Sequence, residues 1–515
     1  MNAIGLWAIA AESPDRTAVI EPGGAAVTYA ELAQEADRYG RGLQALGLRP
    51  GDVVAALLPN SVTALAVYFA AIETGLYVVP VNWHQVAAEV GYILSDSGAG
   101  AFVAHERFAG TAVAAADLAG IKHRFATGPV PGFEPLSELD GGAPGERPHP
   151  RTHGAPMMYT SGTSGRPKGV RRPLTGADPD GAAAGMAAWF FGLFDLAPFD
   201  GHVHLCGSPL YHTAVLNYAT ISIQLGHPVV LMDGWDAEES LRLIERHRVT
   251  HTHAVPTQFR RLLALPEAVR AGYDTSSLRS VIHSAAPCPA EVKRRMIEWL
   301  GPVIVEYYAA TEGGGTLINS EQWLRKPGSV GLPWLGSQVR VLDRAKHEVA
   351  AGQQGLVYMK MGTSTFAYYK DEEKTRAATA GELFTVGDIG YLDEDGYLFL
   401  CDRGSDVIIS GGVNIYPAEI ESELACHPAV ADVAVFGIPH DDWGEEVKAV
   451  VEPVPDVTPG PELTGELLAF LAGRVAKFKL PRTIDYVAEL PRDPNGKLYK
   501  RRLRDPYWAG RDRAI

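Results

Sequence analysis

A short polar stretch, YTSGTSGRPKGV at residues 159–170, has residue types that bind phosphate. Glycines let backbone N–H groups turn toward an anion, and hydroxyl side chains add further donors. Six consecutive residues can contribute in one of these ways: Thr160, Ser161, Gly162, Thr163, Ser164 and Gly165. Lys168 adds a positive charge, so the stretch suits a polyphosphate such as the β- and γ-phosphates of ATP. It differs from the common P-loop, because Gly169 follows the lysine where a magnesium-binding hydroxyl is expected.

A second set of polar residues follows the apolar run PVIVEYYAA. Thr311 and Glu312 come directly after it, and α/β folds place ligands at the carboxyl ends of strands. Triphosphate repels a carboxylate unless Mg²⁺ bridges them, and Mg²⁺ prefers one or two carboxylates plus phosphate oxygens. We therefore expect Glu312 to be a magnesium ligand and Thr160 to be a second contact. Without its flanking motif, Glu312 would read as a solvated loop residue.

Seven further motifs follow the first in order. They are PLYHTA (209–214), SAAP (284–287), EYYAATEGG (306–314), GSVGLP (328–333), TVGDIGYLDEDG (385–396), DRGSDVIISGGVNIYPAEIE (402–421) and PRDPNGKLYKR (491–501). With the first motif they resemble the adenylate-forming superfamily, which comprises acyl-CoA synthetases, nonribosomal peptide adenylation domains and luciferases. The resemblance covers nearly the whole chain, and it implies a loop that holds departing pyrophosphate, with Lys168 stabilising its charge.

The resemblance also implies a nucleotide site. Tyr308 offers a flat face to adenine, Asp388 accepts both ribose hydroxyls, and Arg403 is a second ribose or phosphate contact. Asp388 could instead cap a turn, which is a frequent use of aspartate. Small residues that admit close backbone approach, and neighbours carried over with their motifs, complete the set: Ser284, Ala285, Ala286, Glu306, Tyr307, Ala309 and Thr311. The family often has glycine where this chain has Ser284 and Ala309.

Further residues implied by the resemblance belong to a small C-terminal domain. Lys497 matches a lysine that bridges the substrate carboxylate and the α-phosphate, and Ser405 lies where the family has a hinge residue, usually Asp or Lys. The predicted coenzyme A contacts are Gly411, Gly412, Trp443 and Phe478. The two aromatic residues could equally belong to a core, since a buried aromatic residue is more often structural.

The implied activity is an ATP-dependent carboxylic acid–CoA ligase that uses ATP, Mg²⁺ and coenzyme A. Tyr211 and His212 are expected in the acid pocket. Peptide-synthetase domains normally have aspartate where His212 stands, which argues against an amino acid and favours an apolar acid, with a fatty acid as the first candidate. A carrier protein as acceptor and a luciferase-like oxygenase remain alternatives. A non-catalytic nucleotide-binding module is disfavoured, because Glu312, Asp388, Arg403 and Lys497 are all present.

The elements that must position these residues follow an α/β pattern. β-branched runs such as DVVAALLPN, LYVVPVN and SVIHSAA alternate with helical stretches such as EESLRLIERH, which indicates βαβ units and parallel sheets. We expect a large domain over residues 1–402 and a small mobile α+β domain over 403–515. The basic tail KLYKRRLRDPYWAGRDR is interpreted as a solvated terminal helix.

Composition sets the remaining limits. The chain has 515 residues, which is too long for one core, and a formal charge of −15, which argues against a general nucleic-acid binder. Four cysteines without C-x-x-C spacing favour a reducing compartment. We find no signal peptide or transmembrane pattern and expect a cytoplasmic enzyme. The sequence does not indicate an oligomeric state.

Overall fold

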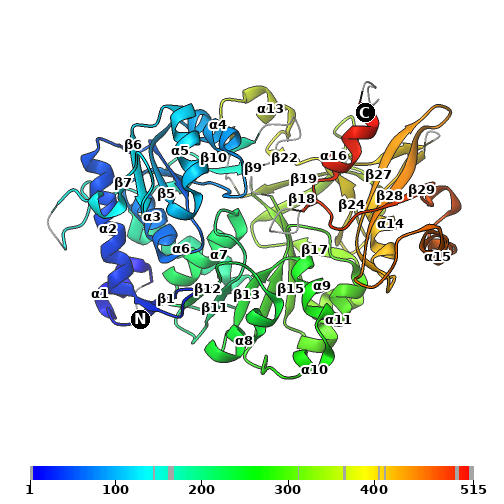
Figure 1. The fold of residues 1–515 in the computed structure, drawn as a ribbon, viewed down its shortest axis with the longest axis horizontal. Helices are drawn as coiled ribbons and strands as arrows, with labels where there is room; N and C mark the ends of the chain where they lie inside the picture. The colour runs from blue at the N-terminus through cyan, green and yellow to red at the C-terminus, as the bar shows by residue number, and fades with distance from the viewer. Residues whose placement is uncertain are drawn as a thin grey trace. The chain divides into compact units, whose positions relative to one another are not determined.

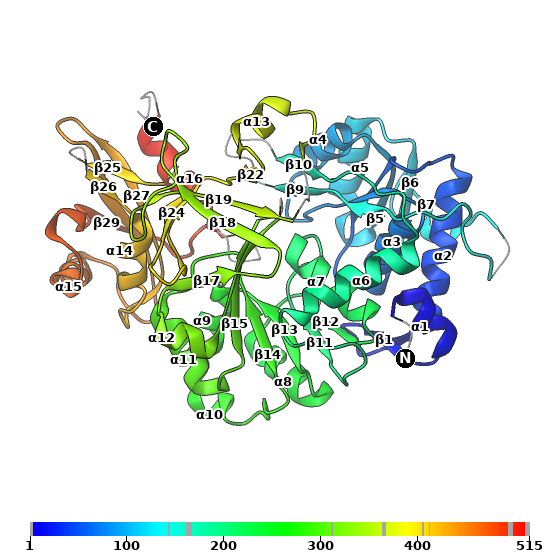
Figure 2. The same ribbon diagram turned by 180° about the vertical axis from the view of Figure 1, so that it is seen from behind.

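The computed structural model describes residues 4–142, 145–160, 167–310, 313–362, 367–403, 406–410, 413–492 and 498–509. The chain divides into two compact units. The first comprises Met1–His253, Glu267–Val281 and Thr365–Ala377, and the second comprises Ala254–Pro266, Ile282–Ser364 and Ala378–Ile515. Figure 1 and Figure 2 show their elements from opposite sides.

A six-stranded parallel sheet dominates the first unit, in the order β7-β6-β5-β3-β4-β8. The strands are β3 (Val53–Leu57), β4 (Tyr77–Pro80), β5 (Ala99–His105), β6 (His123–Thr127), β7 (Glu134–Pro135) and β8 (Ala155–Pro156). The helices on its faces are α2 (Tyr29–Ala45), α3 (Val62–Glu73), α4 (Ala87–Ser97) and α5 (Ala109–Ala119). The βαβ units predicted from the sequence are confirmed here, with α3 connecting the parallel strands β3 and β4.

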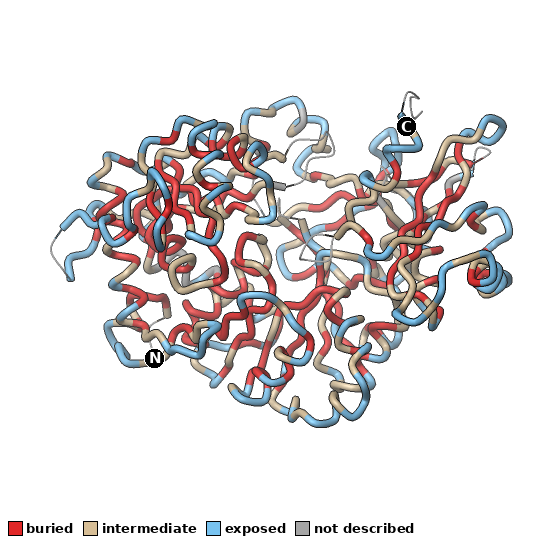
Figure 3. The backbone as a smooth tube through the Cα atoms, in the orientation of Figure 1, coloured by how far each residue is buried: buried red, intermediate tan, exposed pale blue. Residues whose placement is uncertain are grey.

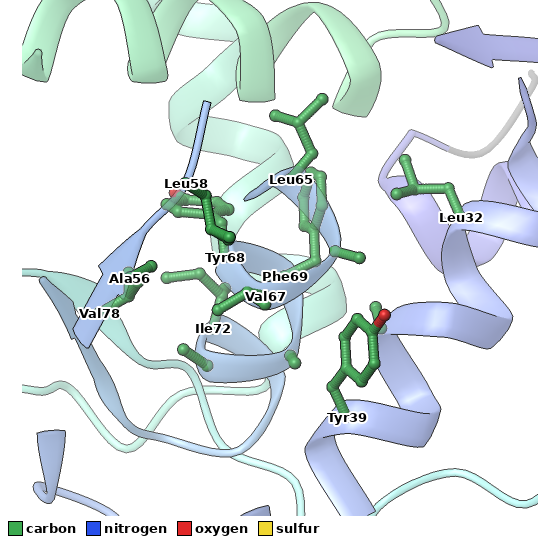
Figure 4. Packing of buried hydrophobic residues seen from close by; sticks show 14 of the residues in the cluster. Leu32, Tyr39, Ala56, Leu58, Leu65, Val67, Tyr68, Phe69, Ile72 and Val78 are labelled. Atoms are coloured by element: carbon green, nitrogen blue, oxygen red, sulfur yellow. The ribbon is translucent and has the colours of Figure 1, made fainter. Parts of the chain in front are cut away.

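Alternating side chains of β3 enter two separate cores, as the two-residue period of a strand requires. Val54 and Ala56 pack with residues of α2 and α3, whereas Val53, Ala55 and Leu57 pack with residues of α4 and α5. Figure 4 shows side chains of α3 beside those of α2 and of the strands. Both faces of the sheet are therefore covered, and Figure 3 shows its strands as buried.

The first unit also holds the parallel strands β1 (Thr17–Ile20), β12 (Val229–Leu231), β11 (His204–Cys206) and β13 (His251–Ala254), with β2 (Ala26–Thr28) antiparallel at the edge. Helices α1 (Leu6–Glu12), α6 (Pro179–Gly192), α7 (Thr213–Gln224) and α8 (Ala237–His247) accompany them. A three-stranded antiparallel sheet joins β9 (Met158–Thr160), β10 (Lys168–Arg171) and β20 (Ala367–Tyr368), followed by α13 (Glu372–Ala377).

The second unit contains an antiparallel array with β15 (Ile304–Ala309), β16 (Gly315–Asn319), β17 (Ser329–Pro333), β24 (Leu398–Arg403), β23 (Asp388–Leu392), β19 (Gly355–Met361) and β18 (Ser337–Leu342). The segment YLDEDGYL contains the turn that connects β23 and β24, with Gly396 at φ +82°. Further elements of this unit are α9 (Pro256–Ala264), α11 (Ala290–Leu300), α12 (Ser320–Arg325), β21 (Thr379–Ala380) and β22 (Leu383–Phe384). The helix α10 (Glu267–Arg270) belongs to the first unit, and the residues of β14 (Ser280–His283) are divided between the two units.

The C-terminal part of the second unit is an α+β fold, as predicted. Its strands are β25 (Ile408–Ser410), β26 (Val413–Ile415), β27 (Val430–His440), β28 (Gly444–Pro453) and β29 (Thr483–Tyr486), and its helices are α14 (Pro417–Leu424) and α15 (Pro461–Leu471). The sheet buries Val433, Val435 and Val447 against both helices. The predicted fold class, α/β with a large parallel-sheet domain and a smaller C-terminal domain, is thus confirmed.

The tail interpretation was partly wrong. A helix, α16 (Lys500–Arg504), does form there, but it is not simply solvated. Lys500 Nζ lies 2.8 Å from Glu421 Oε1, and the side chain of Lys500 is only 13% exposed. Arg504 is buried beside Asp406 at 3.6 Å. The charge pattern of the tail does not reveal these distant carboxylates.

Among the described residues, no helix is both long and apolar enough to cross a membrane.

Candidate active site

Lys168 begins strand β10, directly after the glycine- and hydroxyl-rich loop. In the hairpin of β9 and β10, Thr160 and Lys168 are paired residues, so the two ends of the loop are in register. Residues 161–166, with the predicted donors Ser161, Gly162, Thr163, Ser164 and Gly165, lie outside the described residues, as does the side chain of Thr160.

The Lys168 ammonium has a carboxylate partner that the sequence motifs do not indicate. Its Nζ lies 3.0 Å from Asp371 Oδ2, and this hydrogen bond raises the pKa of Lys168. Asp371 follows β20, which pairs with β10 in the same sheet. The lysine expected to face phosphates is therefore neutralised by an acidic side chain of the same unit.

The predicted pocket residues Tyr211 and His212 lie on a turn before α7. Asn60, itself buried, holds this turn: its Nδ2 donates to the carbonyls of Ser208 and Met232 at 2.9 Å, and its Oδ1 accepts from the Leu210 N–H at 2.8 Å. The ring of Tyr211 is buried and meets Trp83 edge to face, with centroids 5.9 Å apart. The sequence alone does not indicate this role of Asn60, because its hydrogen-bond partners lie 148 to 172 positions away.

Three predicted nucleotide contacts come together in the second unit. The Tyr308 hydroxyl donates to Asp388 Oδ2 at 2.6 Å, and Asp388 is directly opposite Arg403 in the pairing of β23 with β24. Asp388 is 9% exposed. An aromatic face, a carboxylate and the backbone of an arginine are thus gathered from three separate sequence motifs. The side chain of Arg403 is outside the described part.

The SAAP segment follows β14. Ser284 is buried and hydrogen-bonds Tyr307, whose hydroxyl is buried as well. Ala285 has φ +75°, a left-handed conformation in which a β-carbon is strained. The neighbouring Ala286 does not have a positive φ. The left-handed backbone at Ala285 is a feature of this segment, and its close approach to a base stays a prediction.

Glu306 has a different environment from its predicted neighbours. Its Oε2 accepts from Lys293 Nζ at 2.6 Å, and the lysine is fully buried with its ammonium 5.0 Å from the Trp323 ring centroid. Burial raises the pKa of Glu306, while Lys293 opposes that rise. The carboxylate of Glu306 is therefore occupied by an ion pair of the core. The sequence contains one indication of this ion pair, because Lys293 stands on the apolar face of α11, where a lysine needs a buried partner.

Strand β15 ends at Ala309, and Thr311 and Glu312 lie outside the described residues. The magnesium ligands predicted at Glu312 and Thr160 therefore stay a prediction. Among the residues that the structure describes, no group of three or more His, Cys, Asp or Glu side chains is placed to hold a metal ion.

Trp443 and Phe478 are exposed by 41% and 49%, so neither belongs to a core. The Arg482 guanidinium lies 4.6 Å from the Trp443 ring centroid, and Lys479 Nζ lies 5.8 Å from that of Phe478. Such cation–aromatic surfaces suit a nucleotide with phosphate groups. Gly411, Gly412, Ser405 and Lys497 lie outside the described residues; the first two fall between β25 and β26, and Lys497 falls between the bridged residues Arg492 and Leu498.

Comparison with known proteins extends these observations to the whole chain. Residues 6–369 match the family model of the AMP-binding enzyme, and residues 419–497 match that of the AMP-binding enzyme C-terminal domain. The chain is 35% identical over 509 residues to a feruloyl-CoA synthase of an Amycolatopsis species, covering 97% of this chain and 98% of that one. It is 35% identical over 508 residues to the long-chain-fatty-acid–CoA ligase FadD13 of Mycobacterium tuberculosis, covering 96% of both.

Two further matches are a ligase named for a different acceptor and a solved structure. The fatty acid–[acyl-carrier-protein] ligase ScoC of Streptomyces coeruleorubidus is 32% identical over 502 residues, covering 96% of this chain and 94% of that one. The solved structure of ATP-bound MatB from Rhodopseudomonas palustris superposes with a TM-score of 0.82 at 30% identity, covering 98% of this chain and 99% of MatB.

Proposed function

Since the chain belongs to the AMP-binding enzyme family, we propose that it is an ATP-dependent carboxylic acid–CoA ligase that activates an apolar acid. The observation that carries the proposal is the grouping of Tyr308, Asp388 and Arg403. Tyr308 supplies a ring for a base, and Asp388 supplies a buried acceptor for ribose hydroxyls. We also propose that a large N-terminal domain ends at residue 402 and that a small mobile domain begins at residue 403.

The first half-reaction forms an acyl-adenylate. A carboxylate oxygen of the acid attacks the α-phosphorus of ATP, a new O–P bond forms, and pyrophosphate leaves. Lys168 and the loop donors stabilise the departing charge, and Lys497 stabilises the charge that gathers between the carboxylate and the α-phosphate. Bound Mg²⁺ would supply further charge neutralisation, with Glu312 and Thr160 as its protein ligands.

The second half-reaction transfers the acyl group. The coenzyme A thiol loses its proton, its sulfur attacks the acyl carbon, and AMP leaves with the bonding electrons. The Trp443–Arg482 pair and Phe478 are exposed where a large phosphorylated acceptor can contact them. Movement of the small domain about residues near Ser405 would withdraw Lys497 between the two steps.

The acid is proposed to be an aliphatic or aromatic monocarboxylate. Tyr211 lies against Trp83, and His212 stands where amino acid-activating relatives have aspartate. Two of the relatives are named for a long-chain fatty acid and for feruloyl-CoA, which supports an apolar acid of either kind. A fatty acid with a long apolar chain is the first candidate.

The test is a pyrophosphate-release screen over acids graded in chain length and in aromaticity, with ATP, Mg²⁺ and coenzyme A. We expect apolar acids to give the highest kcat/KM and amino acids to give none. An amino acid as the best substrate would contradict the proposal, and so would pyrophosphate release that no acid stimulates.

A carrier protein is the second candidate acceptor, because ScoC is named as a fatty acid–[acyl-carrier-protein] ligase. Both acceptors present the same phosphopantetheine thiol. The two are distinguished by single-turnover transfer from the enzyme-bound adenylate to coenzyme A or to a phosphopantetheinylated carrier protein. Replacing Trp443 with alanine should weaken transfer to coenzyme A more than transfer to the carrier, because the carrier lacks the adenosine portion.

A further inference from the structure

The ion pair between Lys168 and Asp371 joins residues that are 203 positions apart. Their Nζ and Oδ2 atoms lie 3.0 Å apart, and the side chains are 25% and 23% exposed. A nearby second carboxylate, that of Asp96, accepts a hydrogen bond from the Tyr159 hydroxyl at 2.7 Å. Lys168 therefore has a defined anionic partner that remains accessible to solvent and to a ligand.

Asp371 is held in place by backbone contacts. Tyr368 pairs with Val170 in the β10–β20 ladder, and the Tyr369 N–H donates to the Gly169 carbonyl at 2.9 Å. The Asp371 N–H donates to the Tyr368 carbonyl at 3.1 Å. The next residue back, Lys370, reaches the Asp96 carbonyl with its Nζ at 2.7 Å. The segment that carries Asp371 is thus docked on the strand that carries Lys168.

A carboxylate oxygen at this distance from an ammonium makes the same kind of charge-assisted contact that a phosphate oxygen makes with a lysine. We propose that Asp371 is an internal anion that holds Lys168 in the nucleotide-free protein and is displaced by the β- and γ-phosphates of ATP. The inference rests on the proposed function, and it makes Asp371 a residue that sets nucleotide affinity without contacting the acid or the acceptor.

Two physical effects give the inference a direction. The ion pair must break before Lys168 can turn to the polyphosphate, and the released carboxylate then repels the same phosphates. Both effects weaken polyphosphate binding, and neither concerns a ligand that has only an α-phosphate. Removing the charge of Asp371 should therefore tighten the binding of ATP analogues but leave the binding of AMP unchanged.

The experiment measures binding by calorimetry with α,β-methylene-ATP and Mg²⁺, and with AMP in parallel. Because an accessible ion pair contributes up to about 1 kcal/mol, D371N should lower the dissociation constant for the analogue about twofold to fivefold. D371E keeps the charge and should bind as the wild type does. D117N is the matched control, because Asp117 forms an ion pair of the first unit with Arg124, at 2.6 Å.

A double-mutant cycle with K168M separates competition from simple repulsion. The gain from D371N should be larger in the wild-type background than in K168M, because only the wild type has an ion pair to break. An equal gain in both backgrounds, no gain, or tighter AMP binding would overturn the inference. Absence of analogue binding by the wild type would instead overturn the proposed function, so the two failures are distinguishable.

Discussion

The Tyr308 hydroxyl donates a 2.6 Å hydrogen bond to Asp388, which joins β15 to β23 across 80 positions of sequence. The bond fixes the orientation of the aromatic ring and of the carboxylate at once. In the proposed nucleotide site, the ring that would face the base and the carboxylate that would accept the ribose hydroxyls therefore hold each other in place, which would reduce the ordering that binding requires.

Replacing Tyr308 with phenylalanine keeps the ring but removes the donor. The carboxylate of Asp388 loses a charge-assisted hydrogen bond, whose contribution is about 1.5 kcal/mol, so the dissociation constant for α,β-methylene-ATP should rise about tenfold. Calorimetry measures this change. The control is Tyr307→Phe, whose hydroxyl contacts Ser284 instead. Equal losses in the two variants would mean that Tyr308 acts only through packing.

Four buried histidines of the first unit predict acid sensitivity. Burial lowers the pKa of His204 to about 3 and those of His227 and His253 to about 4; it also lowers that of His251 far below its ordinary value. Because the unfolded chain takes up protons near pH 6.5 and the folded chain does not, stability is present above that pH and is lost as the pH falls. Between pH 6.5 and 5.5 the loss is about 1 kcal/mol for each imidazole, or about 4 kcal/mol for the four.

The measurement is the denaturant midpoint between pH 7.5 and 5.5. His204→Leu should reduce the pH dependence of stability, because one titrating group is removed. His347→Gln should leave it unchanged, since the side chain of His347 is 80% exposed. A denaturant midpoint that does not change with pH in the wild type would show that the buried imidazoles titrate alike in the folded and unfolded states.

Ala285 lies at φ +75° and is exposed, so glycine should fit this position better. The left-handed conformation strains an alanine by about 1–2 kcal/mol, and the greater flexibility of unfolded glycine offsets about 0.5–1 kcal/mol. Ala285→Gly should therefore stabilise the protein by about 0.5–1 kcal/mol in denaturant unfolding. Ala286→Gly should destabilise the protein. If both variants change the free energy of unfolding in the same direction, the backbone of Ala285 is not strained.

Asp432 accepts from Arg492 Nε at 2.5 Å and from Arg260 Nη1 at 2.7 Å, and its side chain is 9% exposed. Burial raises its pKa, but the two guanidinium groups outweigh burial and lower it to about 2. Its stabilising contribution is thus complete above pH 3.8 and is lost as the pH falls toward 2.

Asp432→Asn should cost about 3 kcal/mol at neutral pH, because it leaves two partly buried cations without their anion. Asp485→Asn is the control. Asp485 pairs with Lys448 but is 48% exposed, so its replacement should cost less than about 1 kcal/mol in the same unfolding experiment. If the two variants unfold at the same denaturant concentration, Asp432 is no more important than a surface carboxylate.

Local patterns predicted the fold well, because strands and helices of a parallel sheet follow from nearby residues. The β-branched run LYVVPVN forms β4 as expected, and the apolar run before it forms α3. The histidines could also have been grouped from spacing, since HVH and HTH place alternate residues on one face of neighbouring strands, and His204 is paired with His251.

Side-chain partners were less predictable. Three ion pairs illustrate this: Lys168–Asp371, Lys500–Glu421 and Lys293–Glu306. No local sequence pattern relates the two partners of the first pair or of the second pair. Each depends on how distant segments pack, so a motif identifies one partner and says nothing of the other. Lys168 was singled out from its motif, for example, while its carboxylate partner Asp371 was missed.

Lys497→Ala should separate the two proposed half-reactions. A carboxylate that attacks an anionic α-phosphate gathers negative charge, and a cation placed there stabilises the transition state more than bound ATP. Its loss should lower kcat for adenylate formation about 10²–10³-fold with little change in the KM for ATP. Pyrophosphate release measures this step.

The second half-reaction supplies the internal control. Once the adenylate exists, the acid no longer has a free carboxylate that must approach an anionic phosphate, and the moving small domain is expected to carry Lys497 away from the remaining phosphate charge. A chemically prepared acyl-adenylate should therefore react with coenzyme A at close to the wild-type rate in the Lys497→Ala variant. Arg501→Ala is the matched change, because Arg501 lies on α16 in the same tail with its side chain 54% exposed, and it should affect neither step. If thioester formation falls as far as adenylate formation, Lys497 acts in both steps or supports the fold, and the two-conformation scheme fails.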